Sequence, residues 1–154
     1  THIKTLSNII FPSLFVITGI DCIKINRIIL SLKQIAKQYG ENPLSNPDYG
    51  KIINEKHFER VCSLIDADKV VHGGKVNKAT LQIEPTVMDN VTFEDAVMQE
   101  EIFGPILPVL TFDTLQEAVA KINSMPHPLA FYIFTNNLQR YKSYWKKRNV
   151  WVRN

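Results

Sequence analysis

Apolar residues recur along this chain at two spacings, one typical of helices and one typical of strands. From Ile25 to Ala36 they return every three or four positions, with lysine and arginine mostly between them. This spacing predicts an amphipathic helix, which Gly40 should end. A second helix is predicted from about Ile52 to Ile65. The apolar face expected for it consists of Ile53, His57, Phe58, Val61, Leu64 and Ile65.

Short strand patterns follow the second helix. Residues 69–72 (KVVH) are expected to form a strand that Gly73 and Gly74 stop. Residues 81–87 alternate between apolar and polar side chains. They are assigned to a strand or to a sheet edge, because Pro85 has no N–H to donate to a neighbouring strand.

Longer apolar runs predict buried strands. Residues 106–112 form a continuous run and are expected to be covered on both faces. Residues 129–134 form another, and the helix between the two runs should start at a capping box. The run at 8–20 contains a proline and is too short to span a bilayer. It is interpreted as a buried strand, with a signal peptide as the alternative.

The order strand, helix, strand, helix with short connections predicts an α/β fold, a mostly parallel sheet with flanking helices. A chain of 154 residues, 45% hydrophobic and 21% charged, can bury one core. Its charge is uneven. Residues 39–139 hold fourteen acids against seven lysines and arginines, whereas residues 140–154 hold six cations and no acid. We divide the chain into an N-terminal segment 1–38 with a strand and an amphipathic helix, a central domain 39–138 and a basic, aromatic segment 139–154.

Candidate metal and thiol chemistry is sparse. The two cysteines, Cys22 and Cys62, offer neither a disulfide framework nor a zinc spacing, and the four histidines have no ligand spacing. We expect no metal site, no transmembrane segment and, from the cysteine usage, a cytoplasmic protein. Residues 140–153 interleave cations with aromatic rings. Binding to an anionic surface through this tail is a weaker alternative, and nucleic-acid binding is not expected.

The segment MQEEIFGPILP at 98–108 carries the most specific candidate chemistry. Glu101 and Phe103 are two positions apart, so an extended backbone would place both side chains on one side. The carboxylate could accept hydrogen bonds from vicinal hydroxyls while the aromatic ring offers a flat apolar wall. That pair suits the ribose and ring of a nucleotide. The alternative is an acidic loop ahead of a buried strand.

Five blocks in this order and spacing resemble the aldehyde dehydrogenase superfamily, in particular its class 3 or fatty-aldehyde branch. They cover roughly residues 39–138. The blocks are YGENP at 39–43, NPDYGKIINEKHFERV at 46–61, IEPTV at 83–87, VMQEEIFGPILPVL at 97–110 and PLAFYIFT at 128–135.

The resemblance implies oxidation of an aldehyde substrate to a carboxylic acid with NAD or NADP. In the family, a cysteine thiolate attacks the aldehyde and a glutamate activates the water that releases the acid. The resemblance assigns Glu101 to the nicotinamide ribose hydroxyls and Phe103 to the side of the nicotinamide ring. It makes Glu100 structural, gives Gly104 and Pro105 to the turn, and implies that intact relatives form homo-oligomers.

The chain also departs from the family pattern. The family nucleophile lies ahead of the YGENP block in a G-Q-x-C type segment, and no such segment is present. Cys22 is too close to that block, and Cys62 falls within the second helix, so no catalytic residue is assigned. No phosphate-binding glycine fingerprint is present either.

These departures lead to the expectation of a truncated, inactive fragment of an aldehyde dehydrogenase catalytic domain. Frame-shifted or unrelated sequence at the two ends would explain why their charge differs from that of the central region. The alternative is a non-catalytic pseudoenzyme or interaction fragment that docks on a full-length relative.

Overall fold

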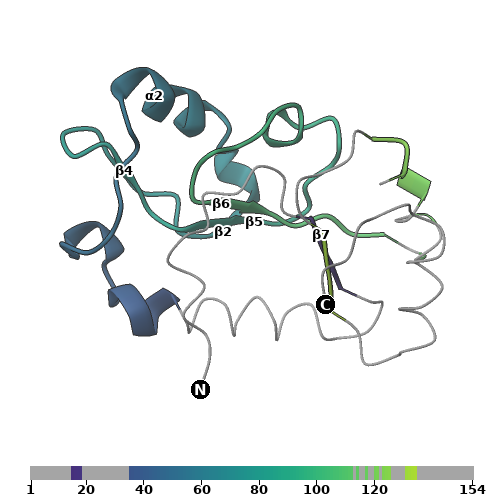
Figure 1. Cartoon of the computed structure of the whole chain (residues 1–154), viewed down its shortest axis with the longest axis horizontal. Helices are drawn as coiled ribbons and strands as arrows, with labels where there is room; N and C mark the ends of the chain where they lie inside the picture. Colours follow the sequence, from purple (N-terminus) through teal and green to yellow (C-terminus); the bar gives the residue numbers. More distant parts are fainter. Residues whose placement is uncertain are drawn as a thin grey trace.

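The computed structural model describes residues 15–18, 35–112, 114, 117, 120, 121, 123–125 and 131–134 (Figure 1). The expected helix over 25–34, Cys22, and the tail from 135 onward lie outside these residues. Residues 35–39 are helical. Gly40 follows with φ +80° and donates its N–H to Ala36 O at 2.9 Å, which confirms that it ends this helix.

The central sheet consists of strands β2 (Val70–His72), β5 (Thr86–Met88) and β6 (Ile106–Pro108) in the order β2-β5-β6. Strand β5 lies in the middle. It runs antiparallel to β2, with Val70 opposite Met88, and parallel to β6, with Thr86 opposite Ile106. A sequence segment assigned to a strand or an edge therefore supplies the middle strand of this sheet.

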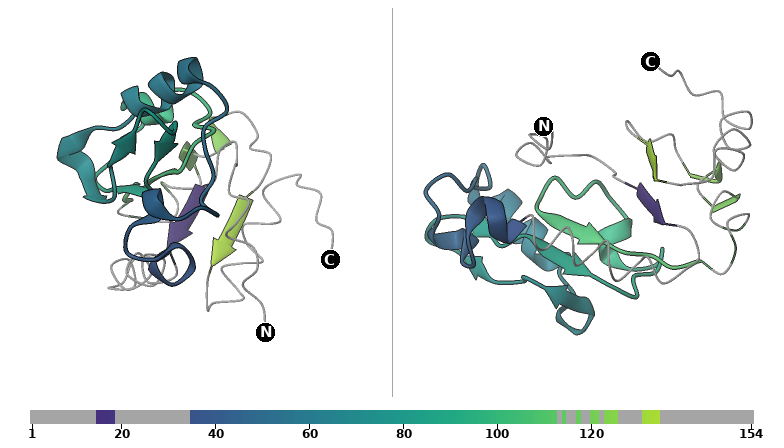
Figure 2. Two further views of the ribbon diagram at one scale, coloured as in Figure 1. Left: turned by 90° about the vertical axis from the view of Figure 1, so that its left-hand side faces the viewer. Right: turned by 90° about the horizontal axis from the view of Figure 1, so that it is seen from below.

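A second parallel pair brings together segments far apart in the chain. Strand β1 (Phe15–Thr18) pairs with β7 (Phe131–Phe134) from Phe15 opposite Phe131 to Thr18 opposite Phe134. Figure 2 shows the two strands side by side. Both lie in runs that the sequence predicted as strands. Parallel pairing and flanking helices confirm the α/β class, with antiparallel pairings added at β2–β5 and at the hairpin of β3 (Val76–Asn77) and β4 (Gln82–Ile83).

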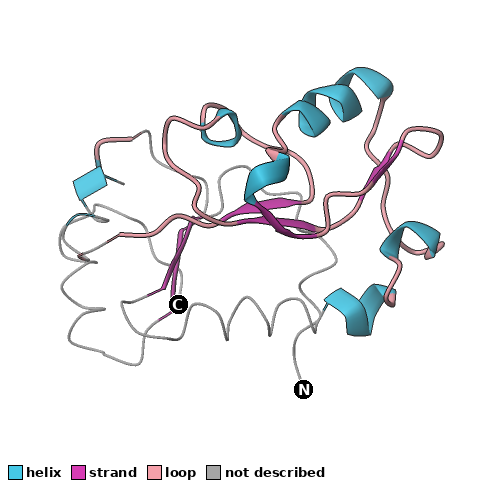
Figure 3. Cartoon of the chain, turned by 180° about the vertical axis from the view of Figure 1, so that it is seen from behind, coloured by secondary structure: helices cyan, strands magenta, loops and turns pink. Residues whose placement is uncertain are grey.

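Helix α2 (Glu55–Ser63) lies on one side of the central sheet (Figure 3). It is shorter than the 52–65 expected. It begins where Asn54 Oδ1 accepts the His57 N–H at 2.8 Å, an N-cap that satisfies a free donor of the first turn. The buried core joins this helix to the sheet. Its members are Phe58, Val61, Leu64, Ile83, Met88, Val91, Val97 and Ile106.

Two sequence expectations about apolar positions are wrong. Ile53 precedes the helix and is 86% exposed, so it does not belong to the apolar face of α2. The run 106–112 forms a strand only over β6, and the residues that follow Ile106 up to 110 are half-buried. Strand β6 ends at Pro108, although the Val109 N–H still donates to Met88 O at 2.8 Å, and the run is not covered on both faces.

Pro85 also explains how the 81–87 segment is divided. It separates β4 from β5, which places it between strands and not within one. Gly73, just after β2, approaches it closely. A Cβ at Gly73 would lie 2.1 Å from Pro85 O, and its φ is +77°. Only glycine fits there, which confirms that Gly73 and Gly74 stop the strand. The remaining short elements are the 3-10 turns η1 (Pro43–Ser45), η2 (Ala67–Lys69) and η3 (Ala96–Met98).

Candidate functional site

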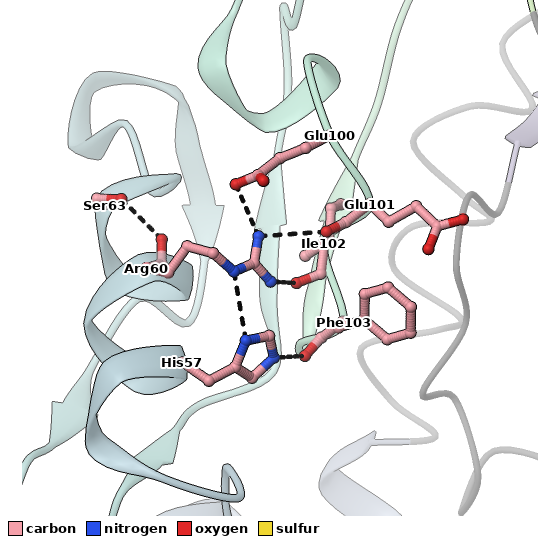
Figure 4. Close-up of polar contacts among 7 residues, drawn as sticks. All are labelled: His57, Arg60, Ser63, Glu100, Glu101, Ile102 and Phe103. Atoms are coloured by element: carbon pink, nitrogen blue, oxygen red, sulfur yellow. Dashed lines mark hydrogen bonds and ion pairs between the residues drawn. The ribbon is translucent and has the colours of Figure 1, made fainter.

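The acidic loop (residues 99–105) connects η3 to β6 and passes alongside α2. Its side chains divide between two sides, as Figure 4 shows. Glu100 points toward α2, whereas Glu101 and Phe103 point away from the helix. Glu101 is exposed, and Phe103 is 40% exposed. The shared side expected for Glu101 and Phe103 is therefore present.

The backbone conformation that places both side chains on this side differs from the extended one expected. The loop is not an extended strand, because Phe103 has φ +46°, in the left-handed region. A left-handed conformation costs a residue other than glycine about 1–2 kcal/mol. The backbone of this loop must therefore be held by other contacts.

Arg60 on α2 supplies the first of those contacts (Figure 4). Its Nη1 donates to Glu100 Oε1 at 2.7 Å and to Glu101 O at 3.2 Å. Its Nη2 donates to Ile102 O at 2.6 Å. Hydrogen bonds from a charged group are worth about 1.5–3 kcal/mol each, enough to offset the left-handed residue. Glu100 balances the charge of the guanidinium, which gives it a structural role.

His57, one helical turn before Arg60, supplies the next contact. Arg60 Nε donates to His57 Nδ1 at 3.3 Å, and His57 Nε2 lies 2.9 Å from Phe103 O. Because guanidinium nitrogens only donate, Nδ1 must accept, and the ring proton sits on Nε2 and is donated to Phe103 O. Two side chains of α2 thus hold three consecutive loop carbonyls.

Gly104 allows the loop to approach α2 this closely. A Cβ at Gly104 would lie 2.6 Å from Val61 Cγ1, closer than side-chain carbon atoms approach one another. Beyond it, Pro105 O accepts the Thr86 N–H at 2.8 Å and joins the loop to the middle strand β5. Gly104 and Pro105 therefore have the turn-forming role expected from the sequence.

The sequence interpretation missed the contribution of α2. It placed His57 on the apolar face and did not assign Arg60 to a contact. A histidine and an arginine three positions apart lie on the same side of a helix, and the acids at 100 and 101 were available as partners. What the pattern lacked was the tertiary pairing of residues about forty positions apart, which local spacing does not encode.

Cys62 is the cysteine that lies among the described residues. It lies half-buried within α2 and packs against the core. Burial, and then the charge of Glu59, raise the pKa of Cys62. A raised pKa leaves less of the thiolate that reacts. Cys62 is only partly buried, whereas the sequence predicted a small buried hydrophobe.

The exposed side of the loop presents a carboxylate and an aromatic ring. Within the described residues, no hydrogen-bond or ion-pair partner of the Glu101 carboxylate is present. The carboxylate and the Phe103 ring are open to solvent on the same side. In the described part of the chain, no group of three or more histidine, cysteine, aspartate or glutamate residues could hold a metal ion. No described helix is long and apolar enough to cross a membrane.

Comparison with known proteins identifies one enzyme family for the chain. A family model described as "Aldehyde dehydrogenase family" matches residues 2–150. The chain belongs to the aldehyde dehydrogenase family. The match extends on both sides of the blocks at 39–138 on which the sequence resemblance rested.

Two relatives illustrate the similarity. The dimeric NADP-preferring aldehyde dehydrogenase of Rattus norvegicus is 46% identical over 113 residues, which cover 73% of this chain and 25% of the relative. The 4,4'-diaponeurosporen-aldehyde dehydrogenase of Staphylococcus aureus is 43% identical over 119 residues, which cover 76% of this chain and 26% of the relative. The chain thus spans about a quarter of the length of these relatives.

Solved structures of aldehyde dehydrogenases share the fold. A structure of the substrate-bound state of Staphylococcus aureus AldH is 39% identical, with a TM-score of 0.79, and the match covers 86% of this chain and 29% of that one. An indole-3-acetaldehyde dehydrogenase in complex with NAD+ is 29% identical, with a TM-score of 0.66 and coverage of 87% and 28%. The described α/β segment is therefore part of an aldehyde dehydrogenase catalytic fold.

Proposed function

We propose that this chain is a segment of the catalytic domain of an NAD(P)-dependent aldehyde dehydrogenase, an enzyme that oxidises an aldehyde to a carboxylic acid. In this proposal, Glu101 and Phe103 contact the nicotinamide half of the cofactor. The names of the relatives support NAD or NADP, since one relative is NADP-preferring and one solved structure holds NAD+. The observation that carries the assignment is the placement of Glu101 and Phe103 on one open side of a loop held by α2.

The residues present fit a nicotinamide ribose. The carboxylate of Glu101 is acceptor-only and can take both vicinal hydroxyls of a ribose, one on each oxygen. The partial exposure of the Phe103 ring leaves a flat surface for a second ring. Glu100 is not placed for this purpose, because its Oε1 is paired with Arg60 and its side chain points toward α2.

When bound, the cofactor accepts a hydride from the substrate carbon. This chain's contribution is positional. Glu101 fixes the sugar, Phe103 limits the rotation of the attached ring, and the contacts of Arg60 and His57 hold the loop carbonyls toward α2. Interactions of this kind lower the entropic cost of reaching the reactive geometry.

We further propose that the 154 residues alone do not turn over aldehydes. Cys62 is half-buried with a raised pKa, and the segment around Cys22 does not match the family nucleophile. The chain is then a cofactor-facing part of a catalytic domain, and it acts on an aldehyde only together with residues that supply the thiolate.

The test is a fluorescence titration of the chain with reduced nicotinamide mononucleotide, which carries the ribose and the ring without the adenosine half. Loss of a charge-assisted hydrogen bond in Glu101→Gln should raise the dissociation constant about tenfold or more. The unfolding free energy of this variant should change little, because the side chain is exposed.

Glu94→Gln is the matched control, since Glu94 is also an exposed carboxylate in the described region. It should bind the mononucleotide as the wild type does. Equal loss of affinity in both variants would mean that the ligand responds to overall charge, and it would contradict a specific role for Glu101.

A further inference from the structure

Three consecutive backbone carbonyls of the acidic loop face the same helix. Glu101 O and Ile102 O accept from Arg60, and Phe103 O lies 2.9 Å from His57 Nε2. In an extended strand, successive carbonyls alternate between the two edges. Three in a row can converge on one helix only if the backbone leaves the strand conformation, as it does at Phe103 with φ +46°.

The same backbone bend decides where the side chains go. With its carbonyls drawn toward α2, the loop directs Glu101 and Phe103 away from the helix (Figure 4). Arg60 also holds Glu100 on the helix side at 2.7 Å. Of the two neighbouring acids, Glu100 therefore forms an ion pair with Arg60, and Glu101 remains exposed to solvent.

We propose that His57 and Arg60 are positioning residues that set the cofactor-facing conformation of the acidic loop through its carbonyls. This inference rests on the proposed function for its purpose, while the loop conformation it describes can be measured without any ligand. Neither residue touches the ligand. Arg60 orders the imidazole as well as the loop, because its Nε–H fixes Nδ1 as the acceptor and Nε2 as the donor.

The first measurement is the protonation pattern of the His57 ring in the full 154-residue chain, from imidazole nitrogen-15 chemical shifts at neutral pH. We expect a single neutral tautomer with the proton on Nε2. In Arg60→Gln this preference should weaken, because the Nε–H donor that selects the tautomer is gone. A ring protonated on Nδ1 in the wild type would overturn the proposal.

The second measurement follows the loop through 4-fluorophenylalanine placed at position 103. We expect one fluorine signal in the wild type and additional or shifted signals in Arg60→Gln and His57→Phe. Arg60→Lys should resemble Arg60→Gln, because one ammonium cannot bridge Glu100 and two carbonyls together. His57→Gln should restore the signal in part, since one amide can accept from Arg60 and donate to Phe103 O.

Lys56→Gln is the matched control, an exposed cation on the same helix. It should leave the fluorine signal unchanged. Circular dichroism and urea unfolding of every variant separate a loop effect from loss of the helix. An unchanged fluorine signal in folded Arg60→Gln and His57→Phe would show that the loop holds its conformation unaided, and the proposal would fail.

Binding of reduced nicotinamide mononucleotide to the same variants links the loop to function. If the competent loop conformation falls to about a tenth of the molecules, the apparent dissociation constant rises about tenfold. If the fluorine signal changes in the variants but the wild type does not bind the mononucleotide, the proposed function is contradicted and the positioning of the loop is supported. Normal binding in variants whose loop signal has shifted would overturn the positioning role.

Discussion

At the scale of single residues, Gly104 decides whether the acidic loop can lie against α2. Replacing Gly104 with alanine would place a methyl group 2.6 Å from Val61 Cγ1. Val61 is fully buried, so it has little room to move. We expect Gly104→Ala to lower the unfolding free energy by about 1–3 kcal/mol, the usual cost of overpacking, measured by urea denaturation.

Two further variants test this steric explanation. Gly50→Ala should be near neutral, because a Cβ at Gly50 meets nothing within 4 Å. Adding Val61→Ala to Gly104→Ala removes the clashing carbon, so the two substitutions should be less destabilising together than the sum of their separate costs. Strict additivity would mean that the alanine at 104 acts through something other than contact with Val61.

The residue scale also shows what the sequence could say about the site. The types and spacing of Glu101 and Phe103 were enough to select them and to expect them on one side. Among the residues that the structure describes, Glu100 forms an ion pair and Glu101 does not. This difference depends on Arg60, which contacts Glu100 only in the folded chain. Because the two glutamates are adjacent and identical, the local sequence does not show which of them forms an ion pair and which remains exposed to solvent.

At the scale of elements, an ion pair joins η2 to η3. Lys69 Nζ lies 2.5 Å from Asp95 Oδ2, and Asp95 also accepts the Thr92 N–H at 2.7 Å. The hydrogen bond from Lys69, followed by that from Thr92, lowers the pKa of Asp95 below its ordinary value of 3.8. A depressed carboxyl pKa stabilises the folded state above the unfolded value, and this stabilisation is lost as the pH falls through the folded value.

We therefore expect the unfolding free energy of the wild type to decline in acid below about pH 4. Asp95→Asn should be less stable at neutral pH and should show a shallower decline over that acid range, since it has no carboxylate to protonate there. Urea unfolding at a series of pH values measures both. Asp48→Asn, at an exposed site, is the control and should keep the wild-type slope. The same slope in Asp95→Asn as in the wild type would rule out this linkage.

Helices and strands could be predicted where residues close in the sequence determine them. Helical periodicity located α2, and Thr114 does accept the Glu117 N–H at 3.2 Å, as the capping box required. The helix bounds were set by Asn54, a cap that the apolar pattern alone did not identify. Strand β6 covers only the first three residues of the apolar run 106–112, and a hydrophobicity pattern alone does not show where in such a run the strand ends.

At the scale of the whole molecule, the fold class followed from the order of elements, but the neighbours of each strand did not. Strand β5 lies between an antiparallel and a parallel partner, and β1 reaches β7 across more than a hundred residues. Pairings of such separation follow from the packing of the complete core, which no short window of sequence contains.

The whole-molecule proposal of an inactive segment has its own test. Incubated with an aldehyde and NAD+ or NADP+, the chain should show no thiol-dependent formation of reduced cofactor, followed by absorbance. The reason is the low thiolate fraction of Cys62 and the absence of the family nucleophile motif. Turnover that disappears in Cys62→Ser or Cys22→Ala would show that one of these thiols is the nucleophile.

The most direct measurement is the nuclear Overhauser effect between the chain and bound reduced nicotinamide mononucleotide. We expect contacts from the nicotinamide protons to the Phe103 ring and from the ribose protons to the Glu101 side chain, with none to Arg60 on the opposite side of the loop. Contacts on the Arg60 side, or bound ligand with none to Glu101 and Phe103, would contradict this expectation.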